Sequence, residues 1–286
     1  MIVDVHAHLF DQHRHLGDTF VAQAGKAAGH EVDLSTHWSQ YWDTAPDETV
    51  ALVIGGKARL SGIWVEDEDV AAFVASVNGR AVGFLSLDPT QPGWWDELVH
   101  AHRDLGLRGI KLMPMYAGFD PAAAEFEPLW AYAESNGLPV LMHTGTTFMS
   151  QAVLAYARPG IADEIARRHP ELRLILAHMG HPYEGECIAV IRKHPHVYAD
   201  ISALHYRPFQ LWNTLMLVQE YGVWHKLLFG SDFPFTTVND TIAGLRRIGG
   251  IVAPGFEPLS MIEIDALVQR DALSLLGLPL PTRDGS

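Results

Sequence analysis

Short apolar segments alternate with longer segments of helical periodicity along the whole sequence. In the longer segments, residues such as Val70, Phe73, Val74 and Val77 recur every three or four positions, as they do on one face of a helix. The short segments are rich in Val, Ile and Leu and cover residues 2–5, 50–54, 81–87, 109–113, 139–142, 173–177, 197–201 and 227–230. Nearly continuous apolar strands that are separated by helices predict a parallel sheet covered on both faces.

The number of strand–helix units indicates how this sheet is arranged. Eight such units in 286 residues suit a closed (β/α)8 barrel of the TIM type, for which about 250 residues is typical. The alternative is an open doubly wound sheet, which usually carries a GxGxxG turn after its first strand, and no such turn follows residues 2–5. We therefore expect an α/β fold with a TIM barrel, as one domain over residues 1–286.

Two regions depart from the regular alternation. Residues 10–48 are polar, rich in Gly, His and Trp, and too long for an ordinary loop between a strand and a helix. We expect this segment to be the first loop on the catalytic face, with short helices of its own, and to serve as a lid or a substrate wall. After the last strand, the pattern predicts a helix at 241–248, a Gly- and Pro-containing turn at 249–258 and helical structure at 261–276, which together form a C-terminal helical extension.

Composition and charge restrict the classes of partner. The 34 acidic and 20 basic side chains give a net charge of −14, which disfavours a nucleic-acid partner. No apolar run reaches the ~20 residues of a membrane span, and the first residues lack the features of a secretory signal. The single cysteine, Cys187, cannot form an internal disulfide, which fits a reducing compartment. We expect a cytoplasmic globular protein that acts on a small molecule, with a homodimer as a common arrangement for such proteins.

The sequence contains 16 histidines, and two of them lie in the first strand. His6 and His8 are two residues apart, so both side chains face the same side of the strand, which in a barrel is the lumen. Their neighbours Val5 and Ala7 are apolar, and we expect these two to face the helices. Two imidazoles in a packed interior cost free energy unless polar groups satisfy them. Hydrogen bonds to carboxylates or to the backbone would do so, and so would a divalent metal ion.

Three further polar residues stand where an apolar strand gives way to a loop. They are His143 after the fifth strand, His178 after the sixth and Asp232 after the eighth. In a barrel these positions open onto the C-terminal rim, where active sites of this fold are built. A single histidine at such a position is usually a hydrogen-bonded rim residue. Four histidines and one aspartate on the same rim instead favour a metal centre.

The order of these residues resembles the amidohydrolase superfamily, in the branch typified by 2-amino-3-carboxymuconate semialdehyde decarboxylase. The resemblance rests on His6-Ala7-His8, on His143, on the turn Ala177-His178-Met179-Gly180 and on the segment 230–234, and it spans nearly the whole chain. It implies that His6, His8, His143 and Asp232 bind one divalent metal ion. The resemblance makes zinc the first choice, with manganese, iron and cobalt as alternatives. It also implies that His178 acts as an acid or base beside the metal.

The chemistry of these residues also indicates a catalytic metal site. Three imidazoles and one carboxylate leave at least one coordination position for water, which is typical of a catalytic rather than a structural zinc site. Bound zinc lowers the pKa of that water to about 7. Asp232 could bind the metal, accept the proton of the water, or do both. His178 could polarise a substrate carbonyl or relay protons, if it lies within hydrogen-bond reach.

Four residues are candidates for the substrate side of the site. Lys111 lies in the fourth strand, where some amidohydrolases carry a carboxylated lysine between two metals. The branch that this sequence resembles does not usually carry one. We therefore expect a single metal, with Lys111 as a positive charge towards the substrate. His205 and Arg207 follow the seventh strand, and an arginine there could clamp a substrate carboxylate with two hydrogen bonds. Trp38 in the first loop could stack on a planar ligand or could anchor that loop on the barrel.

Three functions are compatible with this reading. The first is a metal-dependent hydrolase of a small carbonyl compound, an amide, ester or lactone that carries a carboxylate. The second is a non-oxidative decarboxylase of an aromatic or unsaturated acid, which would use the same ligands. The third is a metal-binding interaction module without catalysis, which the complete set of acid–base candidates disfavours. The fold alone does not separate these functions. The compact length, without a large extra insertion between the barrel strands beyond residues 10–48, favours the hydrolase.

Overall fold

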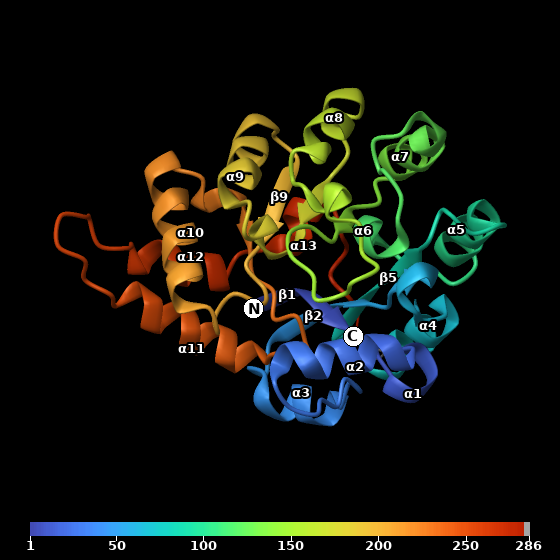
Figure 1. Cartoon of the computed structure of the whole chain (residues 1–286), viewed down its shortest axis with the longest axis horizontal. Helices are drawn as coiled ribbons and strands as arrows, with labels where there is room; N and C mark the ends of the chain where they lie inside the picture. Colours follow the sequence, from blue (N-terminus) through green and yellow to red (C-terminus); the bar gives the residue numbers. More distant parts are fainter. Residues whose placement is uncertain (283–286) are drawn as a thin grey trace.

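A computed structural model of the chain describes residues 1–282, and at its centre lies an eight-stranded parallel sheet (Figure 1). Residues 283–286, the end of the expected domain, lie outside the described residues. Neighbouring strands follow one another in sequence order, as expected when a helix connects each strand to the next. The strands are β1 (Ile2–His8), β2 (Thr49–Ile54), β5 (Ala81–Leu87), β6 (Ile110–Leu112), β7 (Val140–Met142), β8 (Leu174–Leu176), β9 (Val197–Asp200) and β10 (Leu227–Leu228).

The segment that follows β10 closes the sheet onto β1. The backbone N–H of Val5 donates to the oxygen of Phe229 at 3.0 Å, and the N–H of Asp232 donates to the oxygen of His6 at 2.7 Å. Ala7 and Phe233 form a further parallel bridge. These contacts complete a barrel, which confirms the predicted (β/α)8 architecture.

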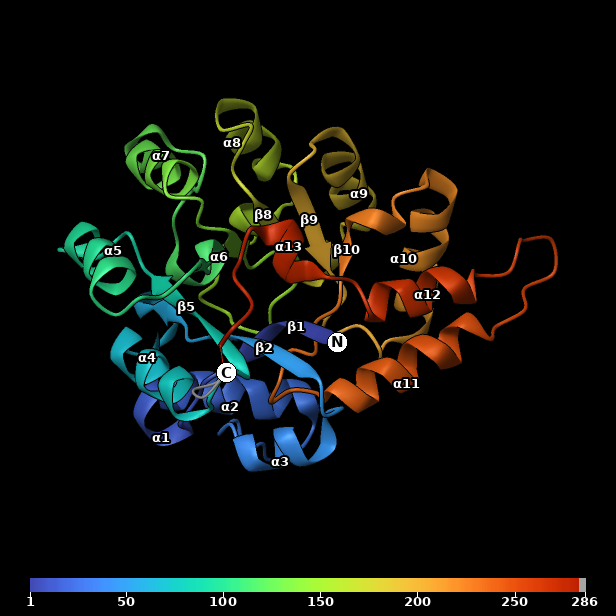
Figure 2. The ribbon, with the colours of Figure 1, turned by 180° about the vertical axis from the view of Figure 1, so that it is seen from behind.

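Helices surround the barrel in the order of the sequence (Figures 1 and 2). Their apolar faces pack on outward-facing strand residues such as Ala51 and Val53, while Leu52 and Ile54 of the same strand face the lumen. The helices that follow successive strands are α4 (Asp67–Ser76), α5 (Trp94–Arg103), α6 (Pro114–Ala117), α7 (Glu127–Ser135), α8 (Ile161–Arg168), α9 (Glu184–Lys193), α10 (Pro208–Tyr221) and α11 (Val238–Gly249). Within residues 1–282, no helix combines the length and the hydropathy that a membrane span requires.

A bulge in β1 changes which of its residues face the lumen. The register with β2 shifts between Asp4 and Ala7, so that one extra residue is accommodated in β1. Val5 therefore packs with the lumen cluster, and the prediction that it faces the helices is wrong. His6 and His8 lie beyond the shift on the lumen side, and their rings are 5.1 Å apart.

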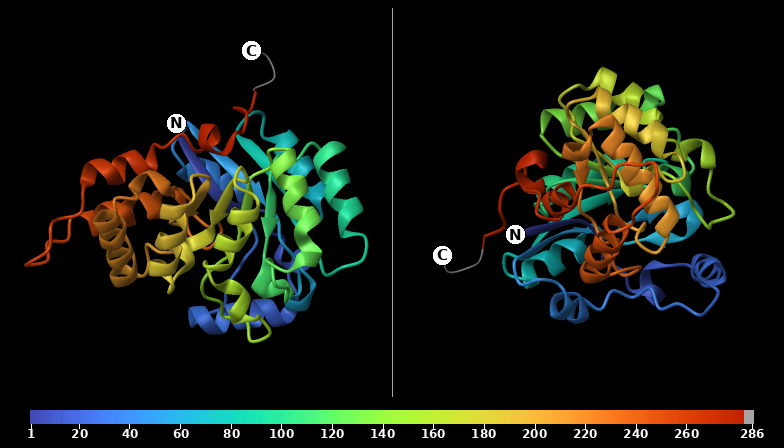
Figure 3. Two further views of the ribbon diagram at one scale, coloured as in Figure 1. Left: turned by 90° about the horizontal axis from the view of Figure 1, so that it is seen from above. Right: turned by 90° about the vertical axis from the view of Figure 1, so that its left-hand side faces the viewer.

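The C-terminal segment closes one end of the barrel. Ala272, Leu273 and Leu276 of α13 (Ala272–Leu276) belong to the same buried cluster as the lumen residues Val3 and Leu141. Figure 2 shows α13 across this end of the barrel. The helical structure predicted at 261–276 is thus divided into α12 (Met261–Val268) and α13, because Asp271 caps a new helix by accepting the N–H of Ser274. The N-terminus and the last described residues, up to 282, lie at this closed end (Figure 3), which leaves the opposite end for a site.

The long first loop carries short helices, as predicted. They are α1 (Gln12–His15), α2 (Asp18–Ala28) and α3 (Trp38–Thr44), and a small hairpin of β3 (Lys57–Ala58) and β4 (Ile63–Trp64) follows β2. In Figure 3, α2 lies at the end of the barrel opposite the N-terminus. The loop therefore covers the end of the barrel where the strands terminate.

Candidate metal centre and active site

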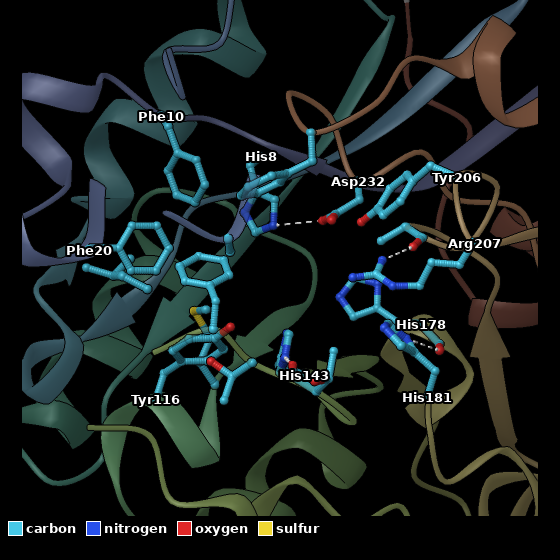
Figure 4. Close-up of a pocket in the computed structure, with 18 residues that line it drawn as sticks. His8, Phe10, Phe20, Tyr116, His143, His178, His181, Tyr206, Arg207 and Asp232 are labelled. Atoms are coloured by element: carbon cyan, nitrogen blue, oxygen red, sulfur yellow. Dashed lines mark hydrogen bonds and ion pairs between the residues drawn. The ribbon is translucent and has the colours of Figure 1, made fainter. Parts of the chain in front are cut away.

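A cavity of about 320 Å³ opens at the carboxyl ends of the strands (Figure 4). Its two sides differ in chemistry. The polar side is lined by His8, His143, His178, His181, Arg207 and Asp232. The apolar side is lined by Phe10, Phe20, Ile63, Met113, Phe148 and Phe235, of which Phe10 and Phe20 come from the first loop. The cavity therefore suits a small ligand with a polar reacting group and an apolar body.

His6 lies at the base of the polar side and is completely buried. Its Nδ1 lies 3.0 Å from Oδ2 of Asp200, and because a carboxylate only accepts, Nδ1 carries the ring proton. The lone pair of His6 is then on Nε2, which lies 3.3 Å from Oδ1 of Asp232. Two hydrogen-bond acceptors thus face each other.

His8 repeats this arrangement. Its Nδ1 lies 3.2 Å from the backbone oxygen of Gly55, so the lone pair is on Nε2, 3.4 Å from the same Oδ1 of Asp232. Two imidazole lone pairs and one carboxylate oxygen therefore converge, and the ammonium of Lys111, 3.2 Å from Nε2 of His6, is the positive charge beside them. A cation bound between these atoms would satisfy all three, and histidine ligands of metals typically donate the other ring N–H to a carboxylate or carbonyl, as His6 and His8 do.

His143 and His178 complete the group of imidazoles. The Nε2 of His143 lies 3.3 Å from the backbone oxygen of Thr146, which places its lone pair on Nδ1. The Nδ1 of His178 lies 2.7 Å from Oγ of Ser202, and its ring stacks on His6 at 4.8 Å and lies 5.1 Å from His143. Within residues 1–282, ligand atoms of His6, His178 and Asp232 lie within 4.8 Å of one another. The donor set fits a divalent cation, and the sequence prediction that His178 is only an acid or base stays a prediction.

Burial determines the charge of these groups. It lowers the pKa of His6, and it lowers those of His8, His143 and His178 well below the usual range, so the imidazoles are neutral. Burial raises the pKa of Asp232 above its usual value, against the opposing effects of His6 and Lys111. Neutral imidazoles are the form that binds metals, and a cation at this place would hold Asp232 ionised.

Asp200 organises the base of the site, although the sequence analysis did not single it out. It holds His6 through Oδ2, while its Oδ1 accepts the backbone N–H groups of His178 and Ser202 at 3.0 Å each. Ser202 Oγ also donates to Oδ1 of Asp200. Burial disfavours its charge, yet His6 and these hydrogen bonds hold the pKa of Asp200 below its usual value. A polar residue at the end of the apolar strand 197–201 was the available signal.

Asp4 holds the backbone beside Asp232 in the same way. Its carboxylate accepts the N–H of Ser231 at 2.8 Å, the Oγ–H of Ser231 at 2.6 Å and the hydroxyl of Tyr41 at 2.9 Å. Asp232 has a φ of +66°, a conformation that is costly for residues other than glycine and that occurs mainly at functional sites. The contacts of Asp4 and Tyr41 thus connect α3 of the first loop to the strand end that presents Asp232.

Lys111 lies in the lumen below the imidazoles. It is buried, and its Nζ donates to Nε2 of His6 at 3.2 Å. Burial lowers the pKa of Lys111 to about 8, against the attraction of Asp232 and Asp200. It does not line the cavity, because its register partners Ser86 and Leu141 belong to a deeper layer of the lumen. The expected charge towards the substrate is instead a charge beneath His6.

Two other predicted substrate residues also lie away from the cavity. Trp38 is buried among aromatic rings and packs on Phe73 at 4.5 Å and on Phe233 at 5.7 Å, so it anchors α3 on the barrel. The Cβ of His205 packs against α11 where Gly244 leaves room for it. Arg207, in contrast, lines the cavity as predicted. The stacking role of Trp38 and the binding role of His205 are therefore not supported.

Comparisons with known proteins agree with this geometry. A model of the amidohydrolase family matches residues 3–250. No curated protein matches the sequence. Similar solved structures include an uncharacterised TIM-barrel protein from Bordetella bronchiseptica, with a TM-score of 0.69 and 19% identity over 96% of this chain and 98% of that one.

Two further similar structures are of enzymes with a named activity. One is a probable 2-pyrone-4,6-dicarboxylic acid hydrolase from Acinetobacter baumannii with citric acid bound (TM-score 0.68, 16% identity, 97% of this chain and 99% of that one). The other is a dihydroxybenzoic acid decarboxylase from a Polaromonas species with bound manganese and the inhibitor 2-nitroresorcinol (TM-score 0.64, 14% identity, 96% of both chains). At these identities the likeness shows the fold.

Proposed function

The chain belongs to the amidohydrolase family, and from this premise we propose that it is a metal-dependent hydrolase of a small carbonyl compound, an amide, ester or lactone that carries a carboxylate. One observation carries the proposal: Oδ1 of Asp232 lies 3.3 and 3.4 Å from the unprotonated Nε2 atoms of His6 and His8, at the base of a cavity that Arg207 also lines. This arrangement suits one divalent cation, and zinc is the ion we propose.

Different residues of the chain would then have different roles in hydrolysis. A divalent cation held by His6, His8, His143 and Asp232 would supply a Lewis acid that polarises the carbonyl and acidifies a water molecule. Asp232 is placed to accept a proton from the attacking water as its oxygen bonds to the carbonyl carbon. His178 Nε2, with Nδ1 held by Ser202, is placed to relay the proton that Asp232 accepts to the oxygen or nitrogen that leaves when the bond breaks.

Arg207 and the apolar wall would hold the rest of the substrate. The guanidinium of Arg207 stacks on the ring of Tyr206 at 4.6 Å and donates to the backbone oxygen of Ala203 at 3.2 Å, which fixes it beside the cavity. A guanidinium held in this way can pair with a substrate carboxylate through two hydrogen bonds. Phe20 and Phe148, whose rings are 5.2 Å apart, would contact the apolar body of the substrate on the other side.

A second candidate function uses the same residues. Phe10, Phe20 and Tyr116 offer aromatic faces on one side of the cavity (Figure 4), which suits a planar ring. Non-oxidative decarboxylation of an aromatic or unsaturated acid would place the ring there and use Asp232 or His178 to protonate the carbon that loses CO2. The decarboxylase from Polaromonas shares the fold, which supports keeping this candidate.

One panel of substrates separates the two reactions. The zinc-loaded protein would be incubated with lactones, esters and amides, each with and without a carboxylate, and with hydroxybenzoates, while acid release and CO2 are followed. We expect acid release from carboxylate-bearing carbonyl compounds, abolished by a chelator and restored by zinc. Release of CO2 without hydrolysis would establish the decarboxylase instead, and full turnover by metal-free protein would refute the role of the metal.

A further inference from the structure

His181 is a further histidine on the polar side of the cavity, beside His178 and Arg207 (Figure 4). Its side chain is buried, with 4% of the residue exposed. Its Nδ1 lies 3.1 Å from the backbone oxygen of His178. Because a carbonyl oxygen only accepts, Nδ1 carries the ring proton and donates it, which leaves the lone pair of the neutral ring on Nε2.

The Nε2 of His181 is buried and has no hydrogen-bond partner among residues 1–282. No N–H of the neighbouring Arg207 is within hydrogen-bond reach of it, and the Nδ1 of His178 is paired with Ser202. Buried polar atoms in folded proteins are nearly always paired, and an exception calls for an explanation. An unpaired lone pair at the wall of a cavity is explained if a ligand supplies the donor.

The backbone holds this lone pair in a fixed position. The N–H of His181 donates to the same oxygen of His178 at 3.1 Å. The neighbouring loop packs against it through Gly145, which has a φ of +92° and lies so close to the oxygen of His181 that no Cβ would fit. His181 is therefore presented by a rigid turn, as a specific binding contact requires.

We propose that His181 Nε2 accepts a hydrogen bond from an O–H or N–H group of the substrate, while Arg207 pairs with the substrate carboxylate. This inference rests on the proposed function and narrows its substrates to carboxylates that also carry a hydroxyl or an amide N–H. A site built to pair with a donor rejects an analogue that lacks it, because the buried acceptor is then left unsatisfied. No bond forms or breaks at His181; its role is to select the substrate.

The test measures binding and needs no turnover. Phenylacetate and its 2-, 3- and 4-hydroxy derivatives have neither a hydrolysable bond nor a carboxylate on the ring, so neither candidate reaction consumes them. Their affinities for the zinc-loaded enzyme would be compared by titration calorimetry. We expect at least one hydroxy derivative to bind about 10-fold more tightly than phenylacetate, the scale of one buried hydrogen bond. Equal affinities for all four acids would overturn the proposal without any variant.

Two variants of His181 and one control assign this preference to the residue. His181→Phe should remove the preference, so that the hydroxy acid binds no more tightly than phenylacetate, whereas His181→Gln, which retains an acceptor oxygen, should recover part of it. His225→Phe, an exposed position in the turn before β10, should behave like the native enzyme. A preference that persists in His181→Phe, or an equal loss for all four acids, would overturn the proposal.

The outcomes also distinguish this inference from the function on which it rests. If carboxylate-bearing carbonyl compounds are hydrolysed but the hydroxy acids show no preference, only the role of His181 fails. If none of the four acids binds the native enzyme, the carboxylate clamp at Arg207 fails as well, and both proposals fall together.

Discussion

Oδ1 of Asp232 and Nε2 of His8 lie 3.4 Å apart, although both atoms are hydrogen-bond acceptors in this structure. The backbone oxygen of Gly55 takes the only ring proton of His8, so the contact with Asp232 is favourable only when a cation or an additional proton lies between them. Burial raises the pKa of Asp232, so the charge of this carboxylate is costly unless a cation lies beside it.

We predict that the protein binds about one equivalent of a divalent metal ion and that Asp232→Asn weakens this binding strongly. The amide keeps the shape of the side chain but removes the negative charge that opposes the desolvation of the ion. Elemental analysis after dialysis measures the stoichiometry, and thermal unfolding with and without zinc measures the coupling of binding to stability. Asp240→Asn, at an exposed carboxylate in α11, is the control; equal metal content in both variants would contradict the assignment.

Asp200→Asn should lower metal affinity roughly 10- to 100-fold, although Asp200 is not proposed as a ligand. An asparagine can turn its NH2 group towards His6, which would move the ring proton of His6 to Nε2 and block the lone pair that faces Asp232. Competition with a chromophoric chelator measures the affinity. The matched control is Asp163→Asn, at a surface carboxylate that pairs with Lys193 and His194. An unchanged affinity in Asp200→Asn would show that Asp200 does not orient His6.

His178→Asn should retain the metal and lose activity about 100-fold or more, the usual effect of removing an acid or base. The test distinguishes an acid or base from a metal ligand, because the ligand atoms of His178, His6 and Asp232 lie within 4.8 Å of one another. Metal content and kcat would be measured on the same preparation. Loss of the metal together with activity would make His178 a ligand, and unchanged turnover would assign it a structural role.

The sequence could predict the barrel and much of the site, because both follow from rules of periodicity. The carboxyl ends of parallel strands meet at one end of a barrel, so His143, His178 and Asp232 could be placed together without knowing any loop. Asp200 obeys the same rule and could have been found by it. The bulge in β1 could not, since nothing in the alternation of residues marks where a strand accommodates an extra residue, and Val5 was misplaced for that reason.

The residues outside the strands were harder to predict. Strand periodicity predicts that Lys111 faces the lumen, but it does not predict the position of Lys111 along the barrel axis. In the structure Lys111 lies below His6. The path of a loop is not encoded by periodicity at all. Trp38 and His205 were therefore assigned to the substrate from residue type and from their place after a strand, whereas their positions depend on packing against Phe233 and Gly244. The unpaired nitrogen of His181 could be recognised only in the structure.

A final prediction concerns stability away from the site. Lys57 and Asp67 form a buried ion pair at 3.0 Å, and Glu97 lies 3.2 Å from the same ammonium. Burial raises the pKa of Asp67 to about 6, although the positive charge of Lys57 opposes this shift. For Lys57, burial disfavours the charged form, but Asp67 and Glu97 raise the pKa of Lys57 above its usual value. Lys57→Met would leave Asp67 as an uncompensated buried charge, and we expect a loss of about 3–5 kcal/mol in the free energy of unfolding at pH 7.

The pH dependence of this loss has a definite sign. A carboxyl whose pKa is higher in the folded than in the unfolded state binds protons more strongly when folded, so its contribution to stability rises as the pH falls from about 6 towards the unfolded value of 3.8. Protonation of Asp67 removes the unpaired charge, and Lys57→Met should therefore be less destabilising at pH 5 than at pH 7. Urea unfolding of variant and native protein at both pH values measures the difference. The control is Arg14→Met, which removes an exposed partner of Asp69 and should lower the free energy of unfolding by about 0–1 kcal/mol. If Lys57→Met lowers the free energy of unfolding equally little, or lowers it more at pH 5 than at pH 7, the charge of Asp67 is not balanced by Lys57.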